Sequence, residues 1–173
     1  MTNLTPNFTL EELTKSPLAV RYNIPEQYKP DAVIVGKLTA LCLHLLEPLK
    51  AAVQKIYPGA SLTQTSGYRC KRVNDLAGGS DASQHMAGEA RDNEMRINGI
   101  EENLKLAQLI LTEKLEFDQM ILEYGTLQKP EWVHTSWDLD KAKQRRMILR
   151  VDYDKDGKKR TYGMTEAQVM NIK

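Results

Sequence analysis

The feature that most constrains the fold is a long amphipathic segment in the first third of the chain. Between residues 35 and 56, leucine, valine and isoleucine recur at steps of three and four residues, the spacing of one stripe along an α-helix. Pro48 lies inside the segment and removes a backbone hydrogen bond, so we expect a kink or a restart of the helix near Glu47. Pro58 and Gly59 end it. The chain therefore has one main core helix, against which the rest must pack.

The other predicted elements are shorter, with helices early in the chain and strands late. Thr9 and Glu12 form a capping-box pattern that predicts a helix over 9–15, and a second amphipathic helix is predicted over 100–114. Alternating or β-branched stretches predict strands over 61–65, 117–124, 132–137, 147–151 and 160–162. This order favours an α+β fold over a doubly wound α/β sheet.

Length and charge limit the classes of protein that need consideration. The 173 residues fit a single domain, residues 1–173. The 24 Lys and Arg against 23 Asp and Glu lack the cationic excess of a sequence-independent nucleic-acid binder, so no nucleic-acid partner is expected. The polar start has no secretory-signal pattern and no window approaches 18 consecutive apolar residues, so we expect no membrane partner and synthesis in the cytoplasm. Cys42 and Cys70 are expected to be reduced.

Two segments carry potential metal ligands, residues 83–92 and residues 132–137. Two imidazoles and one carboxylate suit a catalytic zinc ion, because three protein ligands leave a fourth position for water. His85 and Asp92 can supply two of the three if Gly88 lets the chain turn between them. Strand alternation puts His134 on one face with Trp132, so that His134 could approach from a neighbouring strand. The pattern His-x6-Asp is weak by itself, since most histidines are surface or hydrogen-bonded core groups.

A series of short motifs makes the site more specific. In chain order these are Thr65-Ser66-Gly67-Tyr68-Arg69, Val73-Asn74, Gly78-Gly79-Ser80, Ser83-Gln84-His85, Gly88-Glu89-Ala90, Asp92, Phe117-Asp118-Gln119, Glu123 and Trp132-Val133-His134. Together they resemble peptidase family M15, the zinc D-Ala-D-Ala carboxypeptidase and phage endolysin family, and the resemblance covers roughly residues 7–150. It implies the hedgehog/D-Ala-D-Ala-peptidase-like fold, a small antiparallel sheet with flanking helices.

The resemblance also assigns roles to residues. It implies that Zn²⁺ is bound by His85, Asp92 and His134. Two carboxylates compete for the role of general base: Glu131 precedes His134 by three residues, whereas Glu123 ends the preceding strand. We favour Glu123, and both stay candidates.

Substrate contacts are expected from three further side chains. The resemblance associates Arg69 with holding the substrate peptide, and a guanidinium offers paired donors to a carboxylate or carbonyl. Gln119 shares a strand face with Glu123, and Ser83 lies beside the ligand histidine. Ser83, Gln84 and Ser136 are candidates to orient the ligands through hydrogen bonds. Arg91 and Asn93 flank Asp92, where they are unusual for the family, and alternation along a strand would point them away from the metal face.

The expected function is hydrolysis of a peptide bond in the peptidoglycan stem peptide by a zinc metallopeptidase. The bond is either D-Ala-D-Ala, cut by a carboxypeptidase, or L-Ala-D-Glu, cut by an endopeptidase of the phage or prophage endolysin type. The enzyme is expected to be a monomer and to reach the cell wall after lysis or by an unconventional route. The alternative is a module of the same fold that binds peptidoglycan or a protein partner without turnover.

One further motif resembles a different kind of metal site. Residues 152–157 match the start of an EF-hand calcium loop, but Gly163 stands where the bidentate glutamate is required. We interpret this segment as a charged hairpin turn.

Overall fold

The amphipathic segment forms an interrupted helix at the centre of the core. The structure is a computed structural model that describes residues 1–173, and it divides this helix into α3 (Ala32–Leu41), a π-helical turn η2 (Cys42–Leu46) and α4 (Glu47–Ile56). Pro48 lies in the first turn of α4, where its missing N–H costs least, and the backbone N–H of Glu47 donates to the carbonyl of Cys42. The predicted restart at Glu47 is therefore confirmed.

One stripe of this helix is buried in the main hydrophobic core: Leu38, Leu41, Cys42, Leu45, Leu46, Leu49, Ala52 and Val53. By length and composition alone, Ala32–Ile56 could also cross a membrane, with a hydropathy of 1.6. A core helix of a globular domain meets the same two criteria, and the buried leucines fit that description.

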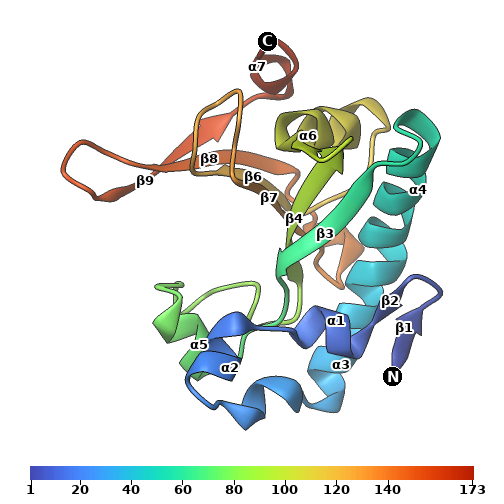
Figure 1. Cartoon of the computed structure of the whole chain (residues 1–173), viewed down its shortest axis with the longest axis vertical. Helices are drawn as coiled ribbons and strands as arrows, with labels where there is room; N and C mark the ends of the chain where they lie inside the picture. Colours follow the sequence, from blue (N-terminus) through green and yellow to red (C-terminus); the bar gives the residue numbers. More distant parts are fainter.

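One mixed sheet crosses the molecule and carries the predicted strands (Figure 1). Its strand order is β3-β4-β7-β6-β8-β9, with the short β5 paired to β4. The strands are β3 (Ser61–Ser66), β4 (Ala90–Ile97), β5 (Ile100–Glu101), β6 (Gln119–Glu123), β7 (Trp132–Ser136), β8 (Met147–Tyr153) and β9 (Lys159–Met164). All pairings are antiparallel except β6 with β8, which run parallel. The α+β class is confirmed, and the sheet is larger than expected and mixed.

Helices cover one face of this sheet and leave the other face for the site. The helix α6 (Asn103–Thr112) packs on β4, β6 and β7 and against α4 (Figure 1). Met120 and Leu122 point into this core, while the alternate residues of β6 point to the opposite face. The predicted helix 100–114 is shorter than expected, because residues 100–101 pair with β4 as β5.

The N-terminal part has more regular structure than its sequence indicates. The predicted helix 9–15 is α1 (Leu10–Thr14), with the Thr9 hydroxyl accepting from the backbone N–H of Glu12 at 3.2 Å. The elements that were not predicted are β1 (Asn3–Thr5), β2 (Phe8–Thr9), α2 (Pro17–Arg21), the 3₁₀ helix η1 (Pro25–Tyr28) and α5 (Lys71–Leu76). The helix α5 lies in a stretch for which the sequence predicts no helix or strand, and its six residues are too few to show a hydrophobic period.

The C-terminal part is a hairpin with one short helical element before it and one after it. The strands β8 and β9 project as an arm from the sheet (Figure 1). At its turn, one carboxylate oxygen of Asp154 accepts from the backbone N–H groups of Asp156 and Lys158, at 3.0 and 2.8 Å. Its other oxygen accepts from Arg160 Nε at 2.8 Å. These contacts confirm a hairpin turn. The remaining elements are the 3₁₀ helix η3 (Lys141–Lys143) and α7 (Glu166–Met170).

Candidate functional site

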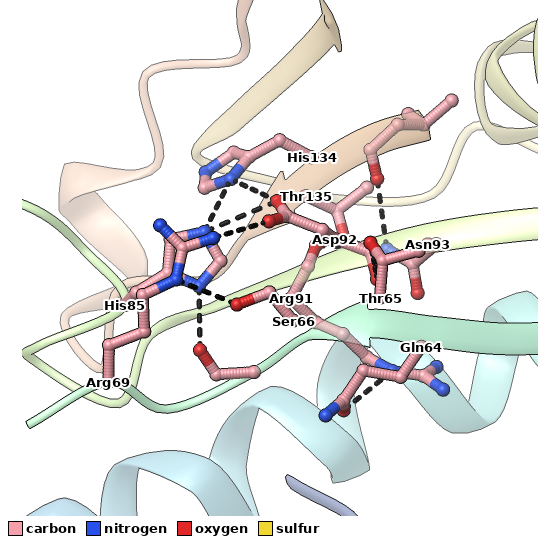
Figure 2. A network of polar contacts seen from close by, with 12 residues as sticks. Gln64, Thr65, Ser66, Arg69, His85, Arg91, Asp92, Asn93, His134 and Thr135 are labelled. Atoms are coloured by element: carbon pink, nitrogen blue, oxygen red, sulfur yellow. Dashed lines mark hydrogen bonds and ion pairs between the residues drawn. The ribbon is translucent and has the colours of Figure 1, made fainter. Parts of the chain in front are cut away.

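Three potential metal ligands meet on the face of the sheet that α6 does not cover. Asp92 in β4 and His134 in β7 are direct cross-strand partners, so both side chains leave the same face. His85 approaches from the loop before β4 (Figure 2). His134 Nδ1 lies 3.0 Å from Asp92 Oδ1 and 3.2 Å from His85 Nε2, and His85 Nε2 lies 3.2 Å from Asp92 Oδ1. The expected trio is therefore brought together, with all three residues buried.

The geometry of these atoms fits a tetrahedral zinc ion. Ligands at the usual zinc distances of about 2.0–2.2 Å lie about 3.3 Å from one another in a tetrahedron. The three measured separations, 3.0 to 3.2 Å, are close to this value. Two imidazoles and one carboxylate leave a fourth position free, as catalytic zinc sites do. The residues present therefore fit a zinc ion.

A backbone carbonyl, not a side chain, orients His85. Its Nδ1 lies 2.7 Å from the carbonyl oxygen of Gly67, and its own carbonyl accepts from the backbone N–H of Arg69 at 3.1 Å. Gly67 is required here, since a Cβ at this position would lie 2.3 Å from the carbonyl oxygen of Leu13. The expectation that Gln84 orients His85 is wrong: its amide donates to Asp118 Oδ2 at 2.6 Å.

The six residues between His85 and Asp92 turn at Gly88, as the spacing requires. Gly88 has φ +72°, and a Cβ there would lie 2.9 Å from a methyl group of Ile34. The next residue, Glu89, binds Lys37 Nζ at 2.7 Å and so ties the loop to α3.

Asp92 is held as a carboxylate by its neighbours. Arg69 Nη2 donates to its Oδ2 at 2.9 Å, leaving Oδ1 for the two histidines, and Arg69 Nε donates to Ser66 Oγ at 2.7 Å (Figure 2). Burial acts to raise the pKa of Asp92, but His85 and His134 outweigh it and hold the pKa well below its usual range. The site therefore keeps a negative charge where a cation would bind.

A cleft of about 700 Å³ opens beside the trio. It is lined by every other residue predicted to act on substrate or water: Arg69, Ser83, Gln119, Glu123 and Glu131.

The two candidate bases differ in their surroundings. Glu123 lies on β6 opposite Trp132 of β7, two residues from the Ile121–His134 pair, so it shares the face of the metal ligands. It is half-buried, and burial together with the Asp92 carboxylate raises its pKa, against the opposing charges of His134, Lys159 and Arg69. Glu131 is exposed and precedes β7. The charges of Asp92 and His134 thus act directly on the Glu123 carboxylate.

The residue after Glu123 extends the site in a way that strand alternation does not predict. Tyr124 has φ +54°, a left-handed conformation that costs energy in a bulky residue, and both it and Glu123 line the cleft. Its ring meets Trp132 edge-on at 5.2 Å between centroids and stacks on Tyr153 at 5.0 Å. Tyr153, Lys159 and Arg145 also line the cleft and were not predicted. All three come from segments that only long-range pairing brings to this face.

The unusual neighbours of Asp92 point away from the metal face, as alternation predicts. Arg91 is fully buried, and its Nη2 donates to Glu12 Oε1 at 3.0 Å. Asn93 donates to the Thr135 hydroxyl at 2.9 Å. The expected orienting role of Ser136 is wrong, because its hydroxyl accepts from the backbone N–H of Gln119 at 2.9 Å and so braces β6 against β7.

Two comparisons with known proteins bear on this site. A search of the curated proteins found no match. The family model described as Peptidase M15 matches residues 6–136, a segment that contains Arg69, the three potential ligands and both candidate bases. The match covers most of the chain, and the structure has a His-Asp-His group beside a cleft within it. The chain therefore belongs to the M15 peptidase family.

Proposed function

We propose that this protein is a zinc-dependent peptidase that hydrolyses a bond in the stem peptide of bacterial peptidoglycan, either D-Ala-D-Ala or L-Ala-D-Glu. The observation that carries the proposal is the convergence of His85, Asp92 and His134 at zinc-ligand separations on the wall of a cleft. Membership of the M15 family supports the reaction class.

The metal site would be formed by His85 Nε2, Asp92 Oδ1 and His134 Nδ1. A zinc ion held there supplies a Lewis acid and lowers the pKa of water toward neutrality. The bonds from Gly67 to His85 and from Arg69 to Asp92 hold two of the ligands in place. The chain thus presents a rigid ligand set to the cleft.

Glu123 is the proposed proton acceptor. Its carboxylate faces the cleft on the same side of the sheet as His134, and it makes no ion pair or hydrogen bond with another side chain that would compete for a water proton. A base in this position takes a proton from the attacking water and returns it to the leaving amine. Glu131 lines the same cleft and is the alternative base.

Arg69, Gln119 and Ser83 are the proposed substrate-positioning residues. Arg69 uses Nη2 and Nε for Asp92 and Ser66, which fixes the plane of its guanidinium at the edge of the cleft. Gln119 lies on β6 four residues before Glu123 and therefore on the same face. Ser83 lies on the loop that leads to His85. These donors surround the position that a scissile peptide would take.

The test is to incubate the zinc-loaded protein with purified stem peptides, alongside a chelated control, and to identify products by mass spectrometry. We expect chelator-sensitive products whose masses name the bond. Intact substrates in the presence of stoichiometric zinc would overturn the peptidase and leave the module that binds without turnover.

We propose that a monomer reaches peptidoglycan after cell lysis or by an unconventional release route, without a nucleic-acid or membrane partner. Its formal charge of +1 supports the absence of a polyanion partner.

A further inference from the structure

A glutamine amide is fully buried behind the site and is bonded only to main-chain atoms. Gln27 lies in the short 3₁₀ helix η1, and none of its surface is exposed. Its Nε2 donates to the carbonyl of Thr14 at 2.9 Å and to that of Tyr68 at 2.6 Å. Its Oε1 accepts from the backbone N–H of Cys70 at 2.9 Å. A buried amide with all its N–H groups bonded in this way fixes the backbone segments that it joins.

The bonds of Gln27 fall on both sides of Arg69. Residues 67–70 form a loop between β3 and α5 that belongs to no helix or strand, so no regular ladder of hydrogen bonds holds them. Tyr68 precedes Arg69 and Cys70 follows it, and each is bonded to the one amide of Gln27. The amide therefore determines the path of the chain through Arg69.

The end of α1 completes this anchor. The helix ends at Thr14, and the last carbonyls of a helix have no partner within it. The carbonyl of Leu13 accepts from the backbone N–H of Tyr68 at 2.8 Å, and the carbonyl of Thr14 accepts from Gln27. The loop 67–70 is thus docked on the end of a helix, and Gln27 joins the two.

The same loop contacts two of the potential metal ligands. The carbonyl of Gly67 lies 2.7 Å from His85 Nδ1, and the backbone N–H of Arg69 donates to the carbonyl of His85 at 3.1 Å. The guanidinium of Arg69 donates to Asp92 at 2.9 Å (Figure 2). Gln27 itself is bonded to neither ligand. A shift of the loop would therefore displace the supports of both ligands together.

We infer that Gln27 is a positioning residue, which holds the loop 67–70 so that His85 and Asp92 keep the separation that a zinc ion requires. This rests on the proposed function, because it concerns the proposed zinc site, and it deepens it. Loss of a group bonded to a ligand usually weakens metal binding by about 10- to 100-fold. Gln27 supports such groups from one step further away, so the lower end of this range is expected.

The test compares Gln27→Met with the control Gln108→Met. Methionine has nearly the volume of glutamine but no N–H group, so the packing is kept and the bonds to the main chain are lost. Gln108 lies on α6, does not line the cleft, and donates through Nε2 to the carbonyls of Val169 and Ile172, both at 3.1 Å. Both variants thus lose two bonds from an amide to backbone carbonyls, and only those of Gln27 reach the loop 67–70.

Two properties of the folded proteins are measured. Competition with a chromogenic chelator gives the dissociation constant for zinc. Hydrogen exchange in the metal-free protein, followed by nuclear magnetic resonance, gives the protection of the Arg69 backbone N–H, whose partner is His85 and not Gln27. We expect Gln27→Met to weaken zinc binding and to speed this exchange, each roughly tenfold. Gln108→Met should match the wild type in both.

Wild-type zinc affinity in Gln27→Met would overturn the inference. Weaker zinc binding with unchanged exchange at Arg69 would overturn it too, because Gln27 would then act by another route. Equal losses in Gln108→Met would show an effect of general stability and would also overturn it. If circular dichroism shows that Gln27→Met does not fold, Gln27→Glu takes its place, since it keeps the size and an oxygen for the Cys70 N–H but loses both donors.

Neither measurement needs a substrate, so turnover of stem peptides is measured separately. If both expected effects are found and the zinc-loaded wild type cleaves nothing, the peptidase is overturned and the role of Gln27 stands. If the wild type cleaves and Gln27→Met matches it in zinc affinity and exchange, the role of Gln27 alone is overturned. If the wild type binds no zinc, the metal site is overturned, together with the inference about its ligands.

Discussion

The Nδ1 atom of His85 lies 2.7 Å from the carbonyl oxygen of Gly67. A carbonyl oxygen can only accept, so Nδ1 carries a ring proton, and Nε2 is the nitrogen that faces Asp92 and His134. The orientation of a potential metal ligand is thus set by the backbone of a glycine 18 residues earlier in the chain.

Gly67→Ala should therefore weaken zinc binding without removing a ligand. The new Cβ would lie 2.3 Å from the carbonyl oxygen of Leu13, which forces the backbone of residue 67 to move. Loss of such a supporting bond weakens metal affinity by about 10- to 100-fold. Competition with a chromogenic chelator measures the zinc affinity. Gly36→Ala is the control, because a Cβ at residue 36 would meet no atom within 4 Å. Equal zinc affinity in the two variants would show that the Gly67 carbonyl is dispensable.

His134→Ala should abolish zinc retention and hydrolysis while the fold persists. The substitution removes one of three ligands, and the strand pairs of β7 with β4 and β6 use backbone atoms that the change leaves intact. The control is His44→Ala, since His44 is exposed and stacks on Trp137 outside the trio. Metal analysis after dialysis and far-ultraviolet circular dichroism test both parts. An active His134→Ala protein that keeps stoichiometric zinc would refute the ligand assignment.

Glu123→Gln should reduce kcat by roughly 10²- to 10⁴-fold while zinc stays bound, because it removes the proposed proton acceptor and no ligand. Glu131→Gln is the matched comparison, since Glu131 lines the same cleft but is exposed and precedes β7. Single-turnover kinetics with zinc analysis of both variants separates the two. A large loss in Glu131→Gln alone would transfer the role, and full activity in both would remove both candidates.

The sequence was sufficient to predict which three potential metal ligands converge and the direction of the strand residues around them. Alternation along β4 correctly places Asp92 on the opposite face of the sheet from Arg91 and Asn93, because successive strand residues face opposite sides. The motif series located His85 and His134, which are 49 residues apart in the chain and whose ring nitrogens are 3.2 Å apart in the structure.

What supports these ligands could not be predicted in the same way. The partner of His85 is a backbone carbonyl, and every residue has one, so no residue type marks it. Gln84 was expected to support His85, but it binds Asp118, 34 residues away. Lys159 reaches the cleft because β6 pairs in parallel with β8. The spacing of apolar residues predicts strands but does not indicate which strands pair.

Asp118→Asn should lower the free energy of unfolding at neutral pH, and this difference from the wild type should disappear in acid. Asp118 is 2% exposed, and although burial acts to raise its pKa, hydrogen bonds from Arg145 and Gln84 hold the pKa below its usual value of 3.8. Its charged form therefore stabilises the fold above that value, and the contribution is lost as the pH falls through the depressed pKa. We expect a loss of about 2 kcal/mol at neutral pH, where one partner of a buried charged hydrogen bond is removed.

Urea unfolding of the wild type and Asp118→Asn at neutral pH and at about pH 3 measures this difference. Asp156→Asn is the control, since Asp156 is an exposed turn residue whose carboxylate makes no ion pair. A difference between wild type and Asp118→Asn that stays constant across the range would contradict the linkage.

Arg150→Met tests how the end of β6 is held. Arg150 is 5% exposed and lies on β8, where Nη1 donates to the carbonyl of Tyr124 at 2.5 Å and Nη2 donates to that of Gly125 at 3.0 Å. These bonds secure the left-handed turn that follows Glu123, so their loss should let the base move while the metal ligands, on other segments, stay in place. We expect roughly tenfold lower kcat, since small misplacements of a catalytic group are costly, with unchanged zinc affinity. The pH dependence of kcat should shift as well, because a freed Glu123 is better solvated and its raised pKa should fall toward the usual value. If kcat and zinc affinity fall by the same factor, Arg150 is a residue of general stability and not one that positions Glu123.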